Sequence, residues 1–75
     1  MEERLLAIVS EVLELPRDQV CLDLHADQVE NWDSLCQLNL VSAVEHGFGV
    51  TIPIEEIDSI AVVRDFVRFI PKEAL

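Results

Sequence analysis

Basic residues and long apolar runs are what this sequence has least of. Five Lys and Arg stand against fifteen Asp and Glu among 75 residues, which gives a formal net charge of −10. A chain without a cationic stripe displaces no counterions from phosphates, so nucleic acid and anionic membrane surfaces are excluded as partners. No stretch approaches the roughly 18 apolar residues of a membrane span. The charge favours protein partners with basic patches, because long-range attraction speeds their encounter.

Metal-binding spacings are also missing. The two cysteines, Cys21 and Cys36, form no C-x-x-C pair, and with two histidines the chain shows no zinc pattern. The acidic stretch 55–58 lacks the D-x-D-x-D-G spacing of a calcium loop. Residues 1–4 lack the basic start and the long apolar run of a secretory signal. We therefore expect a cytoplasmic protein whose thiols are reduced.

The sequence does have enough hydrophobic residues to fold. They make up 51 % of a 75-residue chain, the length of one small domain. Such a domain buries about 60–65 % of its surface, so its core is thin and any cavity is small. The chain has no repeats and no low-complexity segment, and we expect a single domain over residues 1–75.

The first half of the chain predicts one helix and a long acidic loop. In residues 3–15 apolar residues recur at helical spacing, and the next residue is Pro16, which ends a helix because it lacks an N–H. Residues 16–33 form the loop. No second strand is predicted to pair with it, so we expect three of its apolar residues to act as anchors on the helices: Val20, Leu22 and Leu24.

The second half predicts three more helices. Residues 34–46 carry an apolar stripe, and Gly47 suits the left-handed position that follows a helix. A short helix over 54–57 follows a proline, which favours a first helical turn. A last helix is expected over 60–70, with one of two side chains as its cap: Asp58 or Ser59. These elements indicate an all-α fold, a small four-helix bundle with three main helices and one short helix.

The segment Asp33-Ser34-Leu35 places a serine at the predicted start of the second helix. As a nucleophile it would need a base, but His25 lies in the loop and His46 lies twelve residues further on, roughly 18 Å along a helix. There is no G-x-S-x-G elbow, so a small hydrolase is disfavoured. The exposed N–H groups of a helix start suit a serine that carries a phosphate. The alternative is an ordinary helix cap in an unmodified acidic interaction domain.

A set of segments in a fixed order carries a resemblance to a known family. The sequence resembles the acyl carrier proteins and related peptidyl carriers, whose signature is Asp-Ser-Leu at the start of the second helix of a four-helix bundle. The resemblance covers nearly the whole chain. Besides the first helix it includes five segments, which are 31–35 (NWDSL), 40–45 (LVSAVE), 48–53 (FGVTIP), 54–57 (IEEI) and 63–67 (VRDFV).

This resemblance implies a group carrier that is not itself an enzyme. In the family, a phosphopantetheinyl transferase moves the 4′-phosphopantetheine arm of coenzyme A onto the serine, here Ser34, which Asp33 and Leu35 flank. The thiol of the arm carries an acyl, aminoacyl or glyceryl group as a thioester from an acyl-loading enzyme to ketosynthase- or acyltransferase-type partners. The string from Trp32 to Leu35 is similar to small carriers of specialised or polyketide-type pathways. Because the first helix begins near Met1 and the chain ends shortly after the last helix, we expect a stand-alone carrier. We also expect it to be a monomer.

The resemblance also implies a face that partners read. Its positions on the second helix fall on Leu38, Asn39, Ser42, Glu45 and His46. Further contact or pocket positions fall on Ile52 and Ile60. The helix is unusually neutral for the family, and the acidic residues lie instead in the long loop and on the short helix, at Glu55 and Glu56. We hypothesise that a dedicated partner reads those two regions and that fatty-acid synthase enzymes bind the chain poorly. Cys36 is expected to be an exposed thiol, and Trp32 to pack over the helix start.

Overall fold

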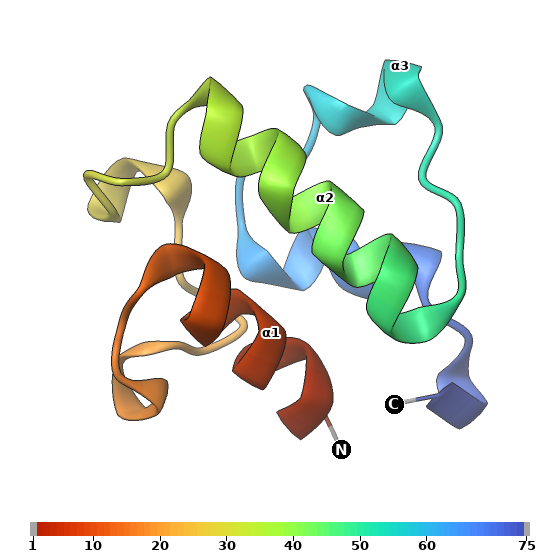
Figure 1. Ribbon diagram of the computed structural model, residues 1–75, viewed down its shortest axis with the longest axis horizontal. Helices are drawn as coiled ribbons and strands as arrows, with labels where there is room; N and C mark the ends of the chain where they lie inside the picture. Colours follow the sequence, from red (N-terminus) through yellow and green to blue (C-terminus); the bar gives the residue numbers. More distant parts are fainter. Residues whose placement is uncertain (1, 75) are drawn as a thin grey trace.

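The computed structural model describes residues 2–74 and shows a helical protein without an extended sheet. Two long helices, α1 (Glu3–Leu13) and α2 (Ser34–Phe48), pack against each other, and a short helix, α3 (Ile54–Ile57), follows. The other elements are 3₁₀-helices: η1 (Arg17–Gln19), η2 (Ala26–Gln28), η3 (Val63–Phe69) and η4 (Lys72–Ala74). Figure 1 shows α1 beside α2, with η3 crossing behind α2. The prediction of an all-α bundle is confirmed.

Helix α1 buries one stripe and ends earlier than predicted. Its buried residues, Leu5, Val9 and Leu13, lie four apart and therefore on one face. The helix ends at Leu13 because Glu14 adopts the left-handed conformation, with φ 57°. The N–H of Leu15 then donates to the carbonyl oxygen of Ser10 at 3.1 Å, which closes the turn. The chain has therefore left the helix before it reaches Pro16.

Helix α2 runs on to Phe48, past the predicted end at His46. The residue in the left-handed position is Gly49, with φ 65°, and not Gly47 as predicted. Gly47 lies inside the helix where α2 approaches α1. A Cβ placed on Gly47 would lie 2.7 Å from Cδ1 of Ile8, so this glycine serves close helix packing.

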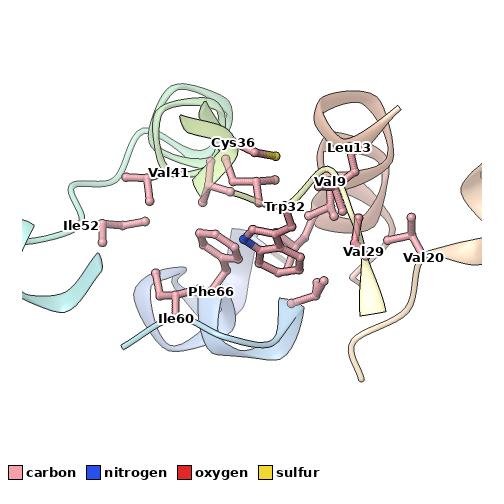
Figure 2. Close-up of a cluster of buried hydrophobic side chains, with 14 of the residues drawn as sticks. Val9, Leu13, Val20, Val29, Trp32, Cys36, Val41, Ile52, Ile60 and Phe66 are labelled. Atoms are coloured by element: carbon pink, nitrogen blue, oxygen red, sulfur yellow. The ribbon is translucent and has the colours of Figure 1, made fainter. Parts of the chain in front are cut away.

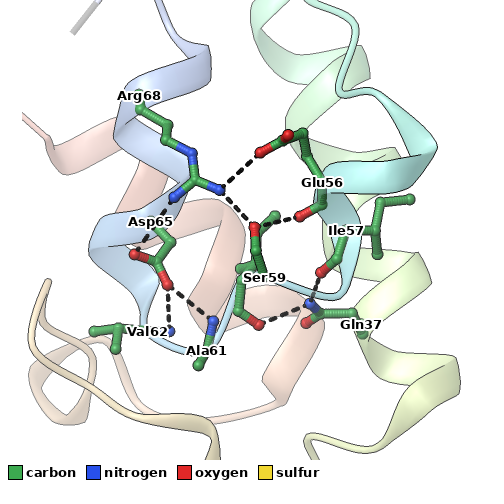
Figure 3. A network of polar contacts seen from close by, with 9 residues as sticks. Gln37, Glu56, Ile57, Ser59, Ala61, Val62, Asp65 and Arg68 are labelled. Atoms are coloured by element: carbon green, nitrogen blue, oxygen red, sulfur yellow. Dashed lines mark hydrogen bonds and ion pairs between the residues drawn. The ribbon is translucent and has the colours of Figure 1, made fainter.

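The predicted helix over 60–70 is wrong in its start and in its type. Residues 63–69 form the 3₁₀-helix η3, and the preceding backbone is extended because it bonds to the long loop. Neither Asp58 nor Ser59 caps it. The carboxylate of Asp65 accepts from the N–H of Ala61 at 2.9 Å and from that of Val62 at 3.1 Å (Figure 3). The cap of η3 is therefore Asp65, a residue of η3 itself.

The long loop pairs with this extended segment, although the sequence predicted no partner for it. The N–H of Ala26 donates to the carbonyl oxygen of Ala61 at 2.8 Å, and the N–H of Val63 donates to Leu24 at 3.0 Å. His25 and Val62 form an isolated antiparallel bridge. The predicted anchors are confirmed in kind, because all three pack on the core: Val20, which is buried, and Leu22 and Leu24, which are half-buried.

One hydrophobic core joins α1, α2, η3 and the end of the long loop. Its largest fully buried side chain is Phe66, and Trp32 belongs to the same cluster, as Figure 2 shows. Among residues 2–74, no polar or charged residue is buried. Trp32 is the last core residue of the loop, so its burial fixes where the loop ends and where α2 begins.

Candidate functional site

Ser34 is the first residue of α2 and lies at the surface. Asp33 precedes it with an extended backbone, and its carboxylate Oδ1 accepts from the N–H of Cys36 at 2.9 Å. The carbonyl oxygen of Asp33 accepts from the N–H of Gln37 at 2.8 Å. The helix start is therefore capped by Asp33, and the Ser34 side chain is not used for capping.

The helix start leaves donors available next to the Ser34 hydroxyl. Within residues 2–74, neither the N–H of Ser34 nor that of Leu35 donates to another group of the chain. Both belong to the positive end of a 15-residue helix, which favours a negative group bound to the serine oxygen. The nearby carboxylate of Asp33 opposes an anion, and its capping bond to Cys36 offsets part of its charge.

The other serines of the chain are placed differently. The hydroxyl of Ser10 donates to the carbonyl oxygen of Leu15 at 2.6 Å. That of Ser59 donates to Glu56 at 2.7 Å and accepts from Arg68 at 2.6 Å. Ser42 is exposed but lies in the middle of α2, where helix hydrogen bonds use the backbone N–H groups. Ser34 alone among the four combines an exposed hydroxyl with the start of a long helix.

A surface pocket of about 450 Å³ opens beside Ser34. One side is formed by the start of α2 and the other by the end of α3 and the residues that follow it. Its lining is Ala26, Trp32, Asp33, Ser34, Gln37, Leu38, Ile57, Asp58 and Ile60. The pocket combines apolar side chains with carboxylate and amide groups, so it can shelter a small group attached near Ser34.

Neither histidine lines the pocket beside Ser34. The Nδ1 atom of His25 accepts from the N–H of Asp27 at 3.3 Å, and the histidine caps η2. His46 lies in the last turn of α2, at the end opposite Ser34. Within residues 2–74, no cluster of His, Cys, Asp or Glu side chains is arranged to hold a metal ion. No described helix is long and apolar enough to cross a bilayer.

The predicted partner-reading residues divide into surface and interior positions. Leu38, Asn39, Ser42 and His46 are exposed along α2, and Leu35 and Glu55 are exposed as well. Glu45 is half-buried, and its carboxylate accepts from the N–H of Ile52 at 2.7 Å. Glu56 bonds to Arg68 at 3.3 Å. Glu45 and Glu56 thus have structural contacts that the sequence did not reveal.

Two of those residues are not at the surface. Ile52 is 3 % exposed and Ile60 is 4 % exposed. The prediction that Ile52 makes a surface contact is therefore wrong, because its side chain is part of the core. Ile60 is also a core residue, but it lines the pocket beside Ser34, which agrees with the second role given to it.

Sequence reasoning did not single out Gln37, which lines the pocket, or Ile54 on α3. Ile54 is the most exposed large hydrophobic residue of the described chain, at 83 %, followed by Leu35 at 69 % and Leu38 at 55 %. An isoleucine directly after Pro53 and before two glutamates was the available signal, since its neighbours predict a surface helix. Gln37 bonds to the indole of Trp32 at 2.6 Å, a contact between loop and helix that no spacing rule reveals.

Cys36 is not the exposed thiol that was expected. Its residue is 8 % exposed and faces the core, whereas Cys21 is exposed. Burial raises the pKa of the Cys36 thiol above its ordinary value, and the negative charge of Asp33 raises it further. The thiol therefore stays protonated at neutral pH and behaves as a small hydrophobic group.

Comparison with known proteins supplies the remaining evidence. Residues 3–70 match the family model described as phosphopantetheine attachment site. An acyl carrier protein of Thermosynechococcus vestitus is 35 % identical over 68 residues, which cover 91 % of this chain and 84 % of the relative. An acyl carrier protein of Beutenbergia cavernae is 38 % identical over 63 residues, which cover 84 % of this chain and 77 % of the relative. An acyl carrier protein of Cyanidium caldarium is 38 % identical over 64 residues, which cover 85 % of this chain and 74 % of the relative.

The fold and the site define a class of protein, a small helical bundle that exposes a serine at the start of its second long helix, beside a surface pocket. The chain belongs to the acyl carrier protein family. Members are non-catalytic carriers whose cofactor is a covalently attached 4′-phosphopantetheine, and the prediction of this cofactor is confirmed. The unpaired N–H groups at the start of α2 and the pocket beside it fit a phosphate-linked arm.

Proposed function

We propose that Ser34 is the residue that carries the arm. A phosphopantetheinyl transferase directs the Ser34 oxygen to the β-phosphorus of coenzyme A. A new P–O bond forms, the P–O bond to the α-phosphate breaks, adenosine 3′,5′-bisphosphate leaves, and the hydroxyl proton passes to the transferase. The single observation that carries this proposal is the exposed Ser34 hydroxyl at the start of α2, next to N–H donors that no other group among residues 2–74 uses.

The proposed activity is the transport of acyl groups as thioesters. When bound, the arm supplies the thiol that holds the group. The residues of this chain hold the phosphate at the helix start and offer a pocket beside it, with Asp33 ordering the first turn through its bond to Cys36. The acyl-carrier names of the relatives support this function.

The proposed partner face includes the exposed apolar residues around the pocket and the acidic residues of α3. Leu35 and Leu38 project from the start of α2, and Ile54 lies at the start of α3. Among residues 2–74, Glu55 has no ion pair, unlike Glu56. A loading enzyme or acceptor enzyme with apolar contacts inside a basic rim is complementary to this face.

The pathway we propose is a specialised or polyketide-type one. The α2 surface is neutral except for Glu45, and that carboxylate is bonded to the backbone of Ile52. Enzymes that read a row of acidic residues on this helix would find little to bind. Fatty-acid synthase enzymes should therefore use this carrier more slowly than their own. Equal rates in a direct competition assay would contradict the pathway assignment.

The attachment proposal is tested by intact mass. The wild-type chain, Ser34→Ala and Ser42→Ala are each incubated with coenzyme A and a broad-specificity transferase. We expect wild type and Ser42→Ala to gain one phosphopantetheinyl group and Ser34→Ala to gain none. Ser42→Ala is the matched control because it removes an exposed hydroxyl from the same helix. Since Ser42 also belongs to the predicted partner-reading face, each reaction is followed to completion, so that the site of attachment and not the rate decides the result. No gain in the wild type would favour the unmodified interaction domain, and a gain in Ser34→Ala would remove Ser34 as the site.

A further inference from the structure

Gln37 joins three segments of the chain beside Ser34. Its Oε1 atom accepts from the indole Nε1 of Trp32 at 2.6 Å. Its Nε2 atom donates to the carbonyl oxygen of Ile57 at 2.7 Å and to that of Ile60 at 2.9 Å. Figure 3 shows the side chain reaching from α2 to the end of α3 and the residues that follow it. The oxygen and the nitrogen of one amide group therefore connect the loop, the helix and residues 57–60.

These bonds hold together the two walls of the pocket. One wall is α2, with Ser34, Gln37 and Leu38, and the other is the segment 57–60. Gln37 donates to the first and the last residue of that segment, so the wall cannot move away from α2 without breaking both bonds. Ile60 lines the pocket and its side chain also belongs to the core, so the bond from Gln37 to Ile60 lies where the pocket meets the core.

We propose that Gln37 is a latch that keeps this pocket shallow, so that the carrier takes short acyl groups and does not enclose long alkyl chains. The inference rests on the attachment of the arm at Ser34. A chain longer than the pocket gains burial only by entering between α2 and residues 57–60. Entry there breaks both bonds. It leaves the amide of Gln37 and the carbonyl of Ile60 without partners among apolar side chains, which is unfavourable, whereas the Ile57 carbonyl keeps the N–H of Ile60. A short acyl group lies in the pocket with the latch closed.

The latch is first tested in the unmodified protein. Trp32 is the only tryptophan of the chain, so its indole N–H gives one resonance in a ¹⁵N-edited spectrum. We expect solvent exchange of this proton to be about tenfold faster in Gln37→Ala than in wild type, because the bond to Oε1 is lost. Gln19→Ala is the matched control, since it makes the same deletion at an exposed glutamine. It should exchange as wild type does.

A second variant separates the two halves of the latch. Gln37→Glu keeps an oxygen for the indole N–H of Trp32 but has no donor for the carbonyl groups of Ile57 and Ile60. We expect its indole proton to stay protected while the backbone N–H of Ile60, which donates to Ile57 at 3.2 Å, exchanges faster than in wild type. This variant tests the wall contact even if Gln37→Ala folds poorly.

The effect on cargo is measured with acylated protein. The transferase loads acetyl or octanoyl arms directly from the acyl-coenzyme A, and hydroxylamine then cleaves the thioesters. In wild type and Gln19→Ala we expect the two cleavage rates to agree within about threefold, because neither acyl group is enclosed between α2 and residues 57–60. In Gln37→Ala and Gln37→Glu the octanoyl thioester should react about tenfold more slowly than the acetyl thioester. A purely structural defect would not depend on chain length.

Two results overturn the latch. One is tenfold protection of the octanoyl thioester in wild type, and the other is the same rate ratio in wild type and both Gln37 variants. If neither acyl group can be loaded, the proposed function fails instead. The indole exchange in the unmodified protein then still decides on the latch, because equal exchange in wild type and Gln37→Ala would contradict it.

Discussion

At the scale of single residues, the proposed attachment requires no activating neighbour for Ser34. A transferase brings its own base, so the carrier has only to expose the hydroxyl and tolerate a phosphate. Capping of α2 by Asp33 leaves the Ser34 side chain free, and the N–H groups of Ser34 and Leu35 remain available. The lack of a base that disfavoured a hydrolase is therefore consistent with attachment.

Cys36 gives a prediction about thiol reactivity. Because Cys36 is buried and its pKa is raised, an alkylating reagent at pH 8 should modify Cys21 about tenfold or more faster than Cys36 in the folded protein. After unfolding, both should react alike. Peptide mapping after timed quenching measures the two rates, with Cys21→Ala as the variant that isolates Cys36. Equal rates in the folded chain would show that Cys36 is accessible.

The same thiol predicts how stability changes at high pH. Its pKa in the folded state lies above the ordinary value of 9.0, so both states hold the proton well below that pH. As the pH rises past 9.0, the unfolded chain releases the proton first and the free energy of unfolding falls. Cys36→Ala should show a smaller fall in urea titrations between pH 8 and pH 10. An identical pH dependence would contradict the shift.

At the scale of elements, the sequence predicted the helices better than their ends. The apolar stripes of α1 and α2 follow directly from helical periodicity, and the short helix α3 was predicted with its observed bounds. The end of α1 depends on Glu14 in a left-handed conformation, which residue type does not reveal. The position of Gly47 depends on the approach of α1, which is a tertiary contact.

The last element could not be predicted from local sequence. The apolar spacing over residues 60–70 predicts a helix that begins at Ile60. Hydrogen bonds between the long loop and residues 61–63 instead hold the start of this segment extended. Asp65 then caps from inside the element, so the nearest capping residue types, Asp58 and Ser59, were misleading. Likewise, Ser34 and the pocket residue Ile60 were identified from the family resemblance, whereas Gln37 depends on contacts between three segments.

The Asp65 cap leads to a matched pair of variants. Asp65→Ala removes the acceptor for the N–H groups of Ala61 and Val62 and should lower the free energy of unfolding by about 1–2 kcal/mol. Asp58→Ala removes an exposed carboxylate that caps nothing, and should change it by about 0.5 kcal/mol or less. Urea denaturation followed by Trp32 fluorescence measures both. Equal losses would show that the cap is not Asp65.

At the scale of the whole molecule, the chain is strongly acidic, and one exposed carboxylate, Glu55, lies at the face that partners are proposed to use. The net charge is −10, and the exposed apolar residues Leu35, Leu38 and Ile54 lie near α3 with its exposed Glu55. Apolar contact provides affinity in such a face, whereas long-range charge speeds encounter. Salt should therefore slow association more than it weakens the final complex.

This arrangement predicts a position-dependent charge effect. Glu55→Gln should lower kcat/KM for the transferase by about two- to threefold at low salt, because the lost charge lies at the proposed face. Glu11→Gln removes the same charge from the exposed surface of α1, away from the pocket, and should have a smaller effect. The difference should disappear at high salt. Equal effects of the two substitutions would favour a general charge effect over a face at α3.

The attachment of the arm at Ser34 is the central claim, and locating the modification tests it most directly. The holo-protein made with the transferase is digested, and fragmentation of its peptides shows which residue carries the phosphodiester. We predict modification at Ser34 alone, with the other serines of the chain, Ser10, Ser42 and Ser59, unmodified. A phosphopantetheinyl group on any of those three, or on none of the four, would contradict the account.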